Sequence, residues 1–514
     1  MPRPSGWVRV FMAVLLVAGC APWDRPLPIR TEVTEAGVTA RLAVPPDLNV
    51  NPAETVVKPD TPPGQESADS AASYGHELER TTFALADAIA FALRNSPRLR
   101  SARAGIERAR GQEQVAFAPF LPQIDLFGQY GVVSSTLNPG VPGYTGSLRA
   151  DGEGTRDYAQ TELGLQWTLY DFGRTGGRYR QSAARGRIAE LQLVRADQTV
   201  EFDVATAYVD VLLARAYRRV QIDAVRRAEA ILDDTVARRT GGVALREDEL
   251  RAQVQVSESR EALVLAREGE FDAVARLNNA MGRNASWPLE VIDLEVQPPL
   301  PGALENLLEG AAVERPEVGL AREQVVAAQE AWQAARGEFL PRIFVRAVAG
   351  YADGRNVITG WQEGAGLHVE APLYAGGRHV GELRSAQADI EAAVADAQAI
   401  LDAISLQVNL AYRDVVAANE RIDLSRTAVA QARENLRLLR VRYLNGDATP
   451  TDIVDSETAL TRSQQRFFSA TYAYLAALAR VDYAVGRHQG AFAGKGKATD
   501  TEELPFPRQA PEMR

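Results

Sequence analysis

The chain has 514 residues and a formal net charge of −10, from 57 basic and 67 acidic side chains. This acidic balance argues against a protein that binds nucleic acid, because such proteins neutralise phosphates with a basic surface. A single cysteine, Cys20, excludes a framework of disulfides within the chain.

Residues 1–19 have the pattern of an export signal. Arg3 and Arg9 precede an apolar run that ends just before Gly19 and Cys20. A basic start, a short apolar run and small residues before a cleavage point are typical of a signal peptide. A cysteine directly after that point resembles the lipid-modified first residue of a bacterial lipoprotein. We therefore expect a lipid on Cys20.

The segments that flank the body of the chain have a different composition. Residues 20–82 are rich in Pro, Ser and Thr, so we expect an extended segment between the lipid anchor and the body. Ala21 is not the aspartate that tends to keep such lipoproteins in the inner membrane, which makes the outer membrane the expected location. The tail 487–514 has few apolar residues, and we expect it to be disordered.

The body contains one pattern twice. The motifs are, in the first copy, Pro97 with Phe120-Leu121-Pro122, Leu169-Tyr170 with Gly173-Arg174, Ala207-Tyr208 and Gly242, and in the second, Pro316 with Phe339-Leu340-Pro341, Leu373-Tyr374 with Gly377-Arg378, Ala411-Tyr412 and Gly446. The first motif recurs after 219 residues (316 − 97) and the last after 204 (446 − 242), so the first copy has 15 extra residues in one loop. Self-similarity on this scale indicates a duplicated architecture. We place the repeats at 83–300 and 301–486.

Each copy predicts one very long helix. Neither Gly nor Pro occurs from Glu382 to Asn445, and the apolar residues there alternate steps of four and three. That spacing is typical of helices packed as in a coiled coil. A helix of about 65 residues is ~100 Å long. Shorter helices are expected at 83–117 and 247–282 in the first copy, and at 303–337 and 451–486 in the second.

Between the helices the apolar period changes from that of a helix to that of a strand. Residues 121–170 and 341–374 each predict a β-hairpin, with apolar and polar residues on opposite sides. This pattern is typical of a transmembrane barrel, and it equally fits a soluble hairpin with one buried face. Four strands are too few to close a barrel, so a membrane role requires several chains. Gln166, His368 and Glu370 fall on the polar side.

These duplicated motifs, in the same order in both copies, resemble the TolC family of outer-membrane channel proteins over about residues 83–486. The resemblance implies a fold that is mainly α with a transmembrane β-barrel contribution. Each subunit of a homotrimer would give four strands to a twelve-stranded barrel, and the long helices would form a coaxial α-helical periplasmic tunnel. The loops 132–158 and 351–361 would face outside, and the turns 241–248 and 445–452 would form the periplasmic tip.

The function implied by the resemblance is a passive outer-membrane exit duct of a tripartite efflux or type I secretion system. Its partners would be a periplasmic adaptor (membrane fusion) protein, an inner-membrane pump and outer-membrane lipid. The cargo stays open between drugs, metals and polypeptides. The alternative is a non-channel coiled-coil lipoprotein that acts as an envelope scaffold, although a scaffold has no use for four alternating strands.

The resemblance also implies a gate at the tip. Asp248 and Asp452 each lie six residues after a tip glycine, and Asp455 follows one helical turn later. In the family such positions ring the narrow end of the tunnel, where crowded carboxylates raise each other's pKa and attract cations. Tyr443 matches a position that helps to hold the tip shut. The ordinary alternative is that these carboxylates are solvated on helix faces.

The tip departs from the family pattern in two ways. The arginine expected two residues after the second tip glycine is Ala448, so another contact must close the tip, and Arg246 is a candidate. The valine that usually precedes each tip glycine, where adaptor hairpins dock, is replaced by other residues. The adaptor-docking tip here consists of Gly241, Gly242, Asn445 and Gly446.

The sequence gives no support for an enzyme. No nucleophile motif such as Gly-x-Ser-x-Gly occurs, so we expect no catalytic residues. The four histidines are scattered without ligand spacing, which predicts no metal site. The two polar barrel-side residues of the second hairpin, His368 and Glu370, are expected to face the barrel lumen together with Gln166. No cofactor is expected beyond the covalent lipid at Cys20.

Overall fold

The computed structural model describes residues 82–135, 154–294, 300–354 and 360–488. The predicted signal peptide, Cys20, nearly all of the segment before residue 83 and nearly all of the tail after 486 lie outside the described residues. Within the described ranges, no helix is both long enough and apolar enough to cross a membrane.

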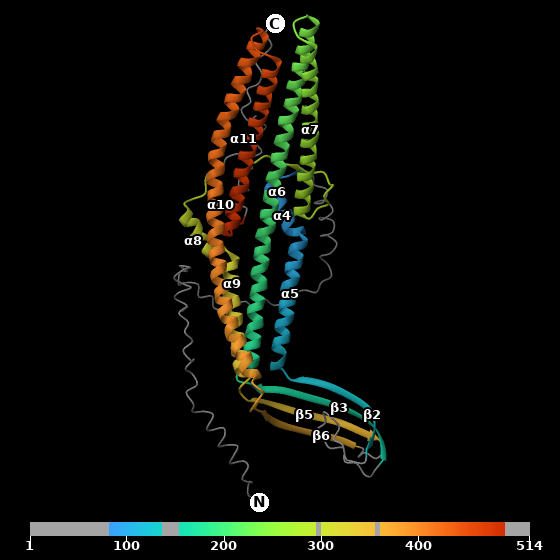
Figure 1. Cartoon of the computed structure of the whole chain (residues 1–514). Coiled ribbons are helices and arrows are strands. Elements are labelled where there is room, and N and C mark those ends of the chain that lie inside the picture. Colours follow the sequence, from blue (N-terminus) through green and yellow to red (C-terminus); the bar gives the residue numbers. More distant parts are fainter. Residues whose placement is uncertain (1–81, 136–153, 295–299, 355–359, 489–514) are drawn as a thin grey trace, which may run out of the picture. The chain divides into compact units, whose positions relative to one another are not determined.

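Two long helices run through the two repeats. Helices α6 (Arg174–Thr240) and α10 (Arg378–Leu444) have 67 residues each, or about 100 Å. Each turns back at its far end into a second helix, α7 (Arg246–Met281) after α6 and α11 (Pro450–Val485) after α10. The members of each pair pack side by side (Figure 1). The repeats thus build two antiparallel helix pairs, α6/α7 and α10/α11.

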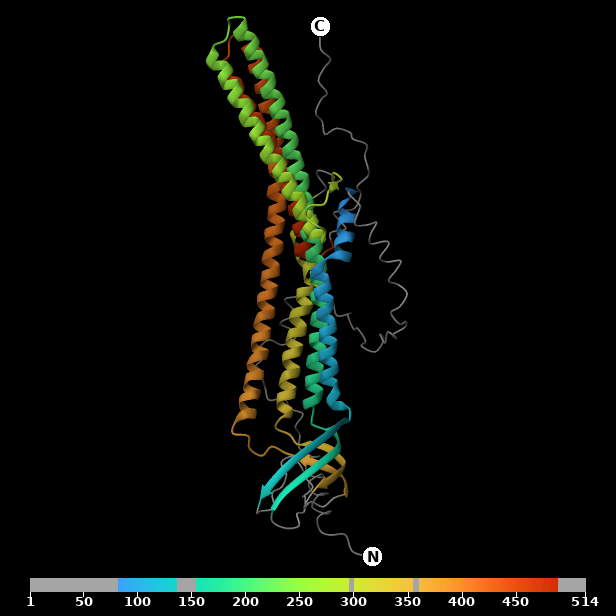
Figure 2. The ribbon, with the colours of Figure 1, turned by 90° about the vertical axis from the view of Figure 1, so that its right-hand side faces the viewer.

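The other half of α6, next to the sheet, packs against two shorter helices. These are α5 (Pro97–Phe117) and α9 (Pro316–Gly337), which lie beside it in both views (Figure 1, Figure 2). Helix α9 also packs against α10. The second repeat therefore contacts α6 at both ends, through α9 near the sheet and through α11 toward the tip.

The first predicted helix of each repeat is broken at a proline. In place of 83–117 the structure has α4 (Leu85–Asn95) and α5, and in place of 303–337 it has α8 (Leu304–Glu314) and α9. Ser96 and Arg315, which precede the two prolines, have extended backbones with ψ of 126° and 119°. A residue before proline is disfavoured in the helical region, whereas proline itself is favoured at the first helical position.

The strand-to-helix corners are left-handed in both repeats. Phe172 and Gly173 have φ of 56° and 89°, and the equivalent Gly376 and Gly377 have φ of 62° and 83°. The Asp171 carboxylate accepts the Thr175 N–H at 2.7 Å and caps the start of α6. The repeated corner motif is therefore a backbone requirement for turning from sheet to helix.

Four strands form one antiparallel sheet. They are β2 (Gln123–Ser135), β3 (Gly154–Tyr170), β5 (Arg342–Gly354) and β6 (Gly360–Glu370), in the order β2-β3-β5-β6. The two hairpins are thus joined through β3 and β5. The outer edges of β2 and β6 pair with no other strand among the described residues, so the sheet of one chain is open.

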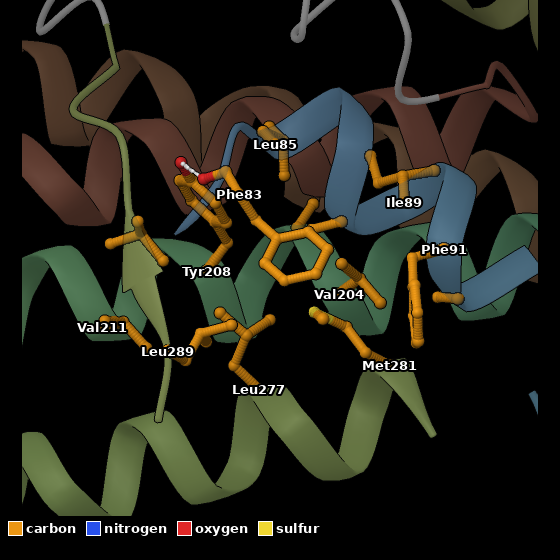
Figure 3. Packing of buried hydrophobic residues seen from close by; sticks show 14 of the residues in the cluster. Phe83, Leu85, Ile89, Phe91, Val204, Tyr208, Val211, Leu277, Met281 and Leu289 are labelled. Carbon is orange, nitrogen blue, oxygen red and sulfur yellow. Dashed lines mark hydrogen bonds between the residues drawn. The ribbon is translucent and has the colours of Figure 1, made fainter. Parts of the chain in front are cut away.

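A compact apolar core lies where α4, α6 and α7 meet (Figure 3). It includes a pair of two-residue parallel strands, β1 (Thr82–Phe83) and β4 (Glu290–Val291), which the sequence did not predict. The fully buried Tyr208 holds them together, because its hydroxyl oxygen lies 3.0 Å from the Phe83 carbonyl oxygen and 2.6 Å from that of Ile292, either of which can accept its one proton, and it accepts the Ile292 N–H at 2.9 Å. Burial raises the pKa of Tyr208, so the hydroxyl stays a donor.

Candidate functional site

The two tip turns have the same backbone geometry. Gly241 and Asn445 end α6 and α10 in right-handed conformations, and Gly242 and Gly446 follow with φ of 77° and 82°. In each turn the residue after the left-handed glycine donates its N–H to a carbonyl near the helix end, Val243 to Arg238 at 2.9 Å and Asp447 to Arg442 at 2.8 Å. A left-handed residue of this kind is the usual end of a helix. The four predicted docking residues therefore form the exposed backbone of two matching turns.

Asp248 and Asp452 cap the helices that leave the tip. The Asp248 carboxylate accepts the Leu245 N–H at 3.1 Å, and that of Asp452 accepts the Thr449 N–H at 2.8 Å and the Thr449 hydroxyl at 2.7 Å. The six-residue spacing from glycine to aspartate is therefore the length of a turn plus a capping position. Helix capping gives a structural reason for the repeated aspartate, alongside the predicted gate.

The second-repeat aspartates differ in their surroundings. Hydrogen bonds from the backbone and side chain of Thr449 hold the pKa of Asp452 below its ordinary value. This direction, within one chain, is opposite to the increase expected from crowding in a ring. The exposed Asp455 makes no hydrogen bond or ion pair with another described residue. Asp452 is thus held in its charged form, and Asp455 is available to other groups.

Tyr443 is only 8% exposed and is covered by an arginine of the other repeat. The Arg238 guanidinium lies over the Tyr443 ring at 4.2 Å and donates to the Tyr443 carbonyl at 3.2 Å. The Nε of Arg238 also donates to the Asp234 carboxylate at 3.1 Å. Arg246 pairs with Glu249 of its own helix instead. Arg238, rather than the expected candidate Arg246, is therefore the arginine that contacts Tyr443.

Two buried carboxylates near the tip were not predicted from the sequence. Glu249 pairs with Arg239 and Arg246, and hydrogen bonding to Arg246, together with the charge of Arg239, lowers its pKa. Glu457 is 7% exposed and pairs with two arginines of other helices. The sequence does contain a pattern that predicts burial of Glu457. This residue lies between the buried Ile453 and Leu460, at the spacing of residues on one packed face of a helix.

One face of the sheet is apolar and exposed. Strand pairing aligns Leu126 with Leu163 and Val345 with Leu367 on this face. Leu126 is 74% and Leu367 62% exposed. Tyr351 and Trp361 contact each other edge to face at 5.6 Å at the outer end of the same face. An exposed apolar surface of this extent marks contact with lipid or with another apolar surface.

The opposite face carries the three predicted polar residues. Gln166 pairs with Arg346, His368 with Phe344, and Glu370 with Arg342 in the strand register, which brings all of them to one face. The His368 ring stacks on that of Phe344 at 5.2 Å, and Arg342 donates to the Glu370 carboxylate at 2.6 Å. The alternation predicted from the sequence therefore matches the register of the sheet.

Duplicated long helix pairs attached to an open sheet with one exposed apolar face define the subunit of an outer-membrane channel. A sequence model of the family described as outer membrane efflux protein matches residues 88–283 and 307–487. These ranges cover most of the chain, and the chain belongs to this family. The resemblance inferred from the duplicated motifs is confirmed.

Individual relatives agree with this assignment. The chain is 25% identical to the alkaline protease secretion protein AprF of Pseudomonas aeruginosa over 80% of this chain and 86% of AprF. It is 25% identical to the outer membrane protein TolC of Salmonella enteritidis over 76% of this chain and 79% of TolC. The crystal structure of the CmeC outer membrane channel of Campylobacter jejuni superposes with a TM-score of 0.68 at 17% identity, over 78% of this chain and 85% of CmeC. VceC of Vibrio cholerae gives a TM-score of 0.67 at 21% identity, over 78% of this chain and 96% of VceC.

The protein is therefore an outer-membrane exit duct, with the fold of a helical tunnel joined to a β-barrel. Its family consists of channels rather than enzymes, and such channels work without a cofactor. Across the part of the chain that the structure describes, no group of three or more His, Cys, Asp or Glu side chains is placed to hold a metal ion.

Proposed function

We propose that three copies of this chain form a passive duct that is closed at its periplasmic tip. A lipid on Cys20 anchors each copy to the outer membrane after the signal peptide is removed. The tip turns around Gly242 and Gly446 dock a periplasmic adaptor, and an inner-membrane pump supplies the energy. The cargo is set mainly by the pump, because a shared duct fold does not itself select a substrate.

The unpaired sheet edges support an assembly of several chains. Strands β2 and β6 each leave a row of backbone donors and acceptors, which a neighbouring copy can satisfy by closing a barrel. In a barrel of three copies, the face with Gln166, His368 and Glu370 lines the lumen and the apolar face meets lipid. A polar interior and an apolar exterior are the usual arrangement of such barrels.

Two exposed apolar stripes on the helices support the same assembly. On α7 the stripe consists of Leu250, Val264 and Phe271, and on α10 of Leu410, Leu424 and Leu438, all exposed and spaced by multiples of seven residues. Such spacing matches one helix against another. The stripes lie on different surfaces of the subunit, so α7 of one copy can pack against α10 of the next copy. Repeated contacts between two different surfaces of this kind close the copies into a ring.

The proposed gate combines charge with a mechanical closure. Asp248, Asp452 and Asp455 each occur three times around the axis and make the closed end prefer cations. Arg238 and Tyr443 hold the α6/α7 pair against the α10/α11 pair. Adaptor docking at the tip turns separates the pairs and widens the constriction. The hydrogen bonds that lower the pKa of Asp452 keep this charge in place below neutral pH.

Single-channel recording in planar bilayers tests the proposal. Asp452→Ala with Asp455→Ala is expected to lower cation selectivity and to abolish block by trivalent cations. Asp452→Asn with Asp455→Asn removes the charges but keeps an oxygen that can cap α11, so it should give the same result if charge is the cause. Because the pKa of Asp452 is lowered, wild-type block should persist as the pH falls toward the ordinary aspartate value of 3.8.

A control variant and a rival outcome complete the test. Asp402→Ala removes an exposed carboxylate of α10 far from the tip and should leave both properties unchanged. Unchanged cation selectivity in the Asp452 and Asp455 variants would contradict the proposal that these aspartates form a charged ring at the tip. A chain that forms no heat-resistant trimer and no pore would instead favour the envelope scaffold.

A further inference from the structure

Three arginines of the first repeat join the two helix pairs near the tip through contacts between described residues. They are Arg238 with Tyr443, Arg251 with the Thr451 hydroxyl at 2.6 Å, and Arg227 with Glu457 at 2.5 Å. The residues that receive these contacts all belong to α10 or α11. The first-repeat pair thus holds the second-repeat pair by its arginines.

The Glu457 contact is the most buried of the three. One carboxylate oxygen accepts from Arg227 Nε at 2.5 Å, and the other accepts from Arg440 Nη2 at 2.6 Å. Arg227 also donates to the Thr461 hydroxyl at 3.1 Å, so it bridges two successive turns of α11. Charge-assisted hydrogen bonds of this kind are among the strongest that a protein makes.

The two arginines of Glu457 belong to different helix pairs. Arg440 lies on α10 and stays with Glu457 whenever α10 and α11 move together. Arg227 lies on α6, so its bond crosses between the pairs. If the pairs separate, Glu457 keeps one arginine and loses the other. The open state therefore does not leave a buried carboxylate without a partner, which would be strongly unfavourable.

We propose that Glu457 is a second closing point of the gate, held by Arg227 and separate from the Arg238–Tyr443 contact. This inference rests on the proposed gating of the duct. Arg227 and Arg238 are 11 residues apart on α6 (238 − 227), or about 16 Å along the helix. The pairs are thus fastened at two levels, by Arg238 and Arg251 beside the tip turn and by Arg227 farther from it, and opening requires both levels to release. Arg440 positions the carboxylate and takes no part in the closure between pairs.

The matched arginines of Glu457 provide the test. Arg227→Gln, recorded as single channels in planar bilayers, should raise the open probability about tenfold, as expected when a charge-assisted hydrogen bond of the closed state is lost. Arg440→Gln removes a bond of similar length to the same carboxylate and should stay within about twofold of wild type, since its bond does not cross between the pairs. Arg227→Gln combined with Glu457→Gln should open at most about two- to threefold further than Glu457→Gln alone, because only the bond of Arg227 to the Thr461 hydroxyl is left to lose.

The outcomes separate this inference from the gate on which it rests. Arg238→Ala serves as the reference for opening at the first level. If Arg238→Ala opens the channel and Arg227→Gln does not, the second closing point is wrong while the gate stands. If Arg440→Gln opens it as much as Arg227→Gln, the assignment of roles is overturned. If no variant conducts, the proposed channel itself fails.

A second variant covers poor assembly of Arg227→Gln. Thr461→Val removes only the other bond of Arg227 and keeps the ion pair with Glu457. It is expected to raise the open probability by about two- to threefold, in line with the loss of one neutral acceptor. Wild-type behaviour of Thr461→Val in a stable trimer would contradict the role of Arg227.

Discussion

The two halves of helix α6 are fastened to the second repeat in different ways. Near the sheet, ion pairs run from α6 along the antiparallel α9 to its C-cap residue Glu338. They are Arg174–Glu338 at 3.3 Å, Arg178–Glu338 at 2.7 Å, Arg180–Glu330 at 2.7 Å, Arg187–Glu323 at 2.8 Å and Arg195–Glu317 at 2.7 Å. Toward the tip, the links to α10 and α11 run through Arg227 and Arg238. The sheet-side half is bonded along its length, whereas the tip half is held at separate points.

Close backbone packing adds to this difference. A Cβ atom on Gly177 of α6 would lie 2.8 Å from backbone atoms of Glu330 and Ala334 in α9. The two helices therefore touch backbone to backbone within the region of the ion pairs. A duct that opens at one end needs such a fixed part, so that separation of the helix pairs at the tip does not spread to the sheet.

The largest expected effect of a single change falls on the fixed half. Glu317 pairs with Arg195 and with Arg315, whose side chain is 2% exposed. Burial lowers the pKa of Arg315, and the charge of Glu317 opposes that decrease. Glu317→Gln leaves both arginines without their carboxylate and should cost about 3 kcal/mol. The thermal midpoint of the purified trimer measures the loss.

An outer member of the same row of ion pairs serves as the control. Arg187 is 49% exposed, so its pair with Glu323 is largely solvated. Glu323→Gln should therefore cost at most about 1 kcal/mol. Equal losses of stability in the Glu317 and Glu323 variants would mean that burial does not determine how much each ion pair stabilises the protein.

The next effect tests the backbone contact in the fixed half. Gly177→Ala forces α6 away from α9 and should cost about 1–3 kcal/mol, as overpacking does. Gly186→Ala is the matched change on the same helix, where the new Cβ meets only the flexible end of Glu113 at 3.8 Å. Alanine there should stabilise the helix by up to about 1 kcal/mol. A neutral Gly177→Ala in thermal unfolding would contradict the close approach.

Much of the fold follows from periodicity in the sequence. The long helices and both hairpins were expected because their apolar periods persist over many residues. The breaks before Pro97 and Pro316 were missed, since the helical composition continues on both sides. Strands β1 and β4 were missed because two residues carry no period, and the buried hydroxyl of Tyr208 holds them together.

The tip was predictable only in part. The turns and the capping positions of Asp248 and Asp452 repeat in the sequence, so their places could be found by counting from a glycine. The partner of Tyr443 could not, because Arg238 lies 205 residues away in the other repeat. Glu457 was overlooked because a glutamate in a polar helix resembles the many glutamates that are solvated on helix surfaces. Contacts between repeats depend on helix packing, which local sequence does not encode.

The smallest effect on stability is expected from Arg238, together with a large effect on opening. Arg238→Ala removes a cation–π contact and one hydrogen bond to the Tyr443 carbonyl, worth about 1 kcal/mol together at a partly exposed site. Arg442 is the equivalent arginine of the second repeat, and it donates to the Asp447 carbonyl of its own turn at 3.1 Å. Arg442→Ala should therefore leave the gate closed, while Arg238→Ala raises the single-channel open probability with little change in thermal midpoint. If both variants open the duct equally, closure depends on the shape of the turns rather than on contacts between the repeats, and the distinction between a fixed half and a releasable half of α6 loses its basis.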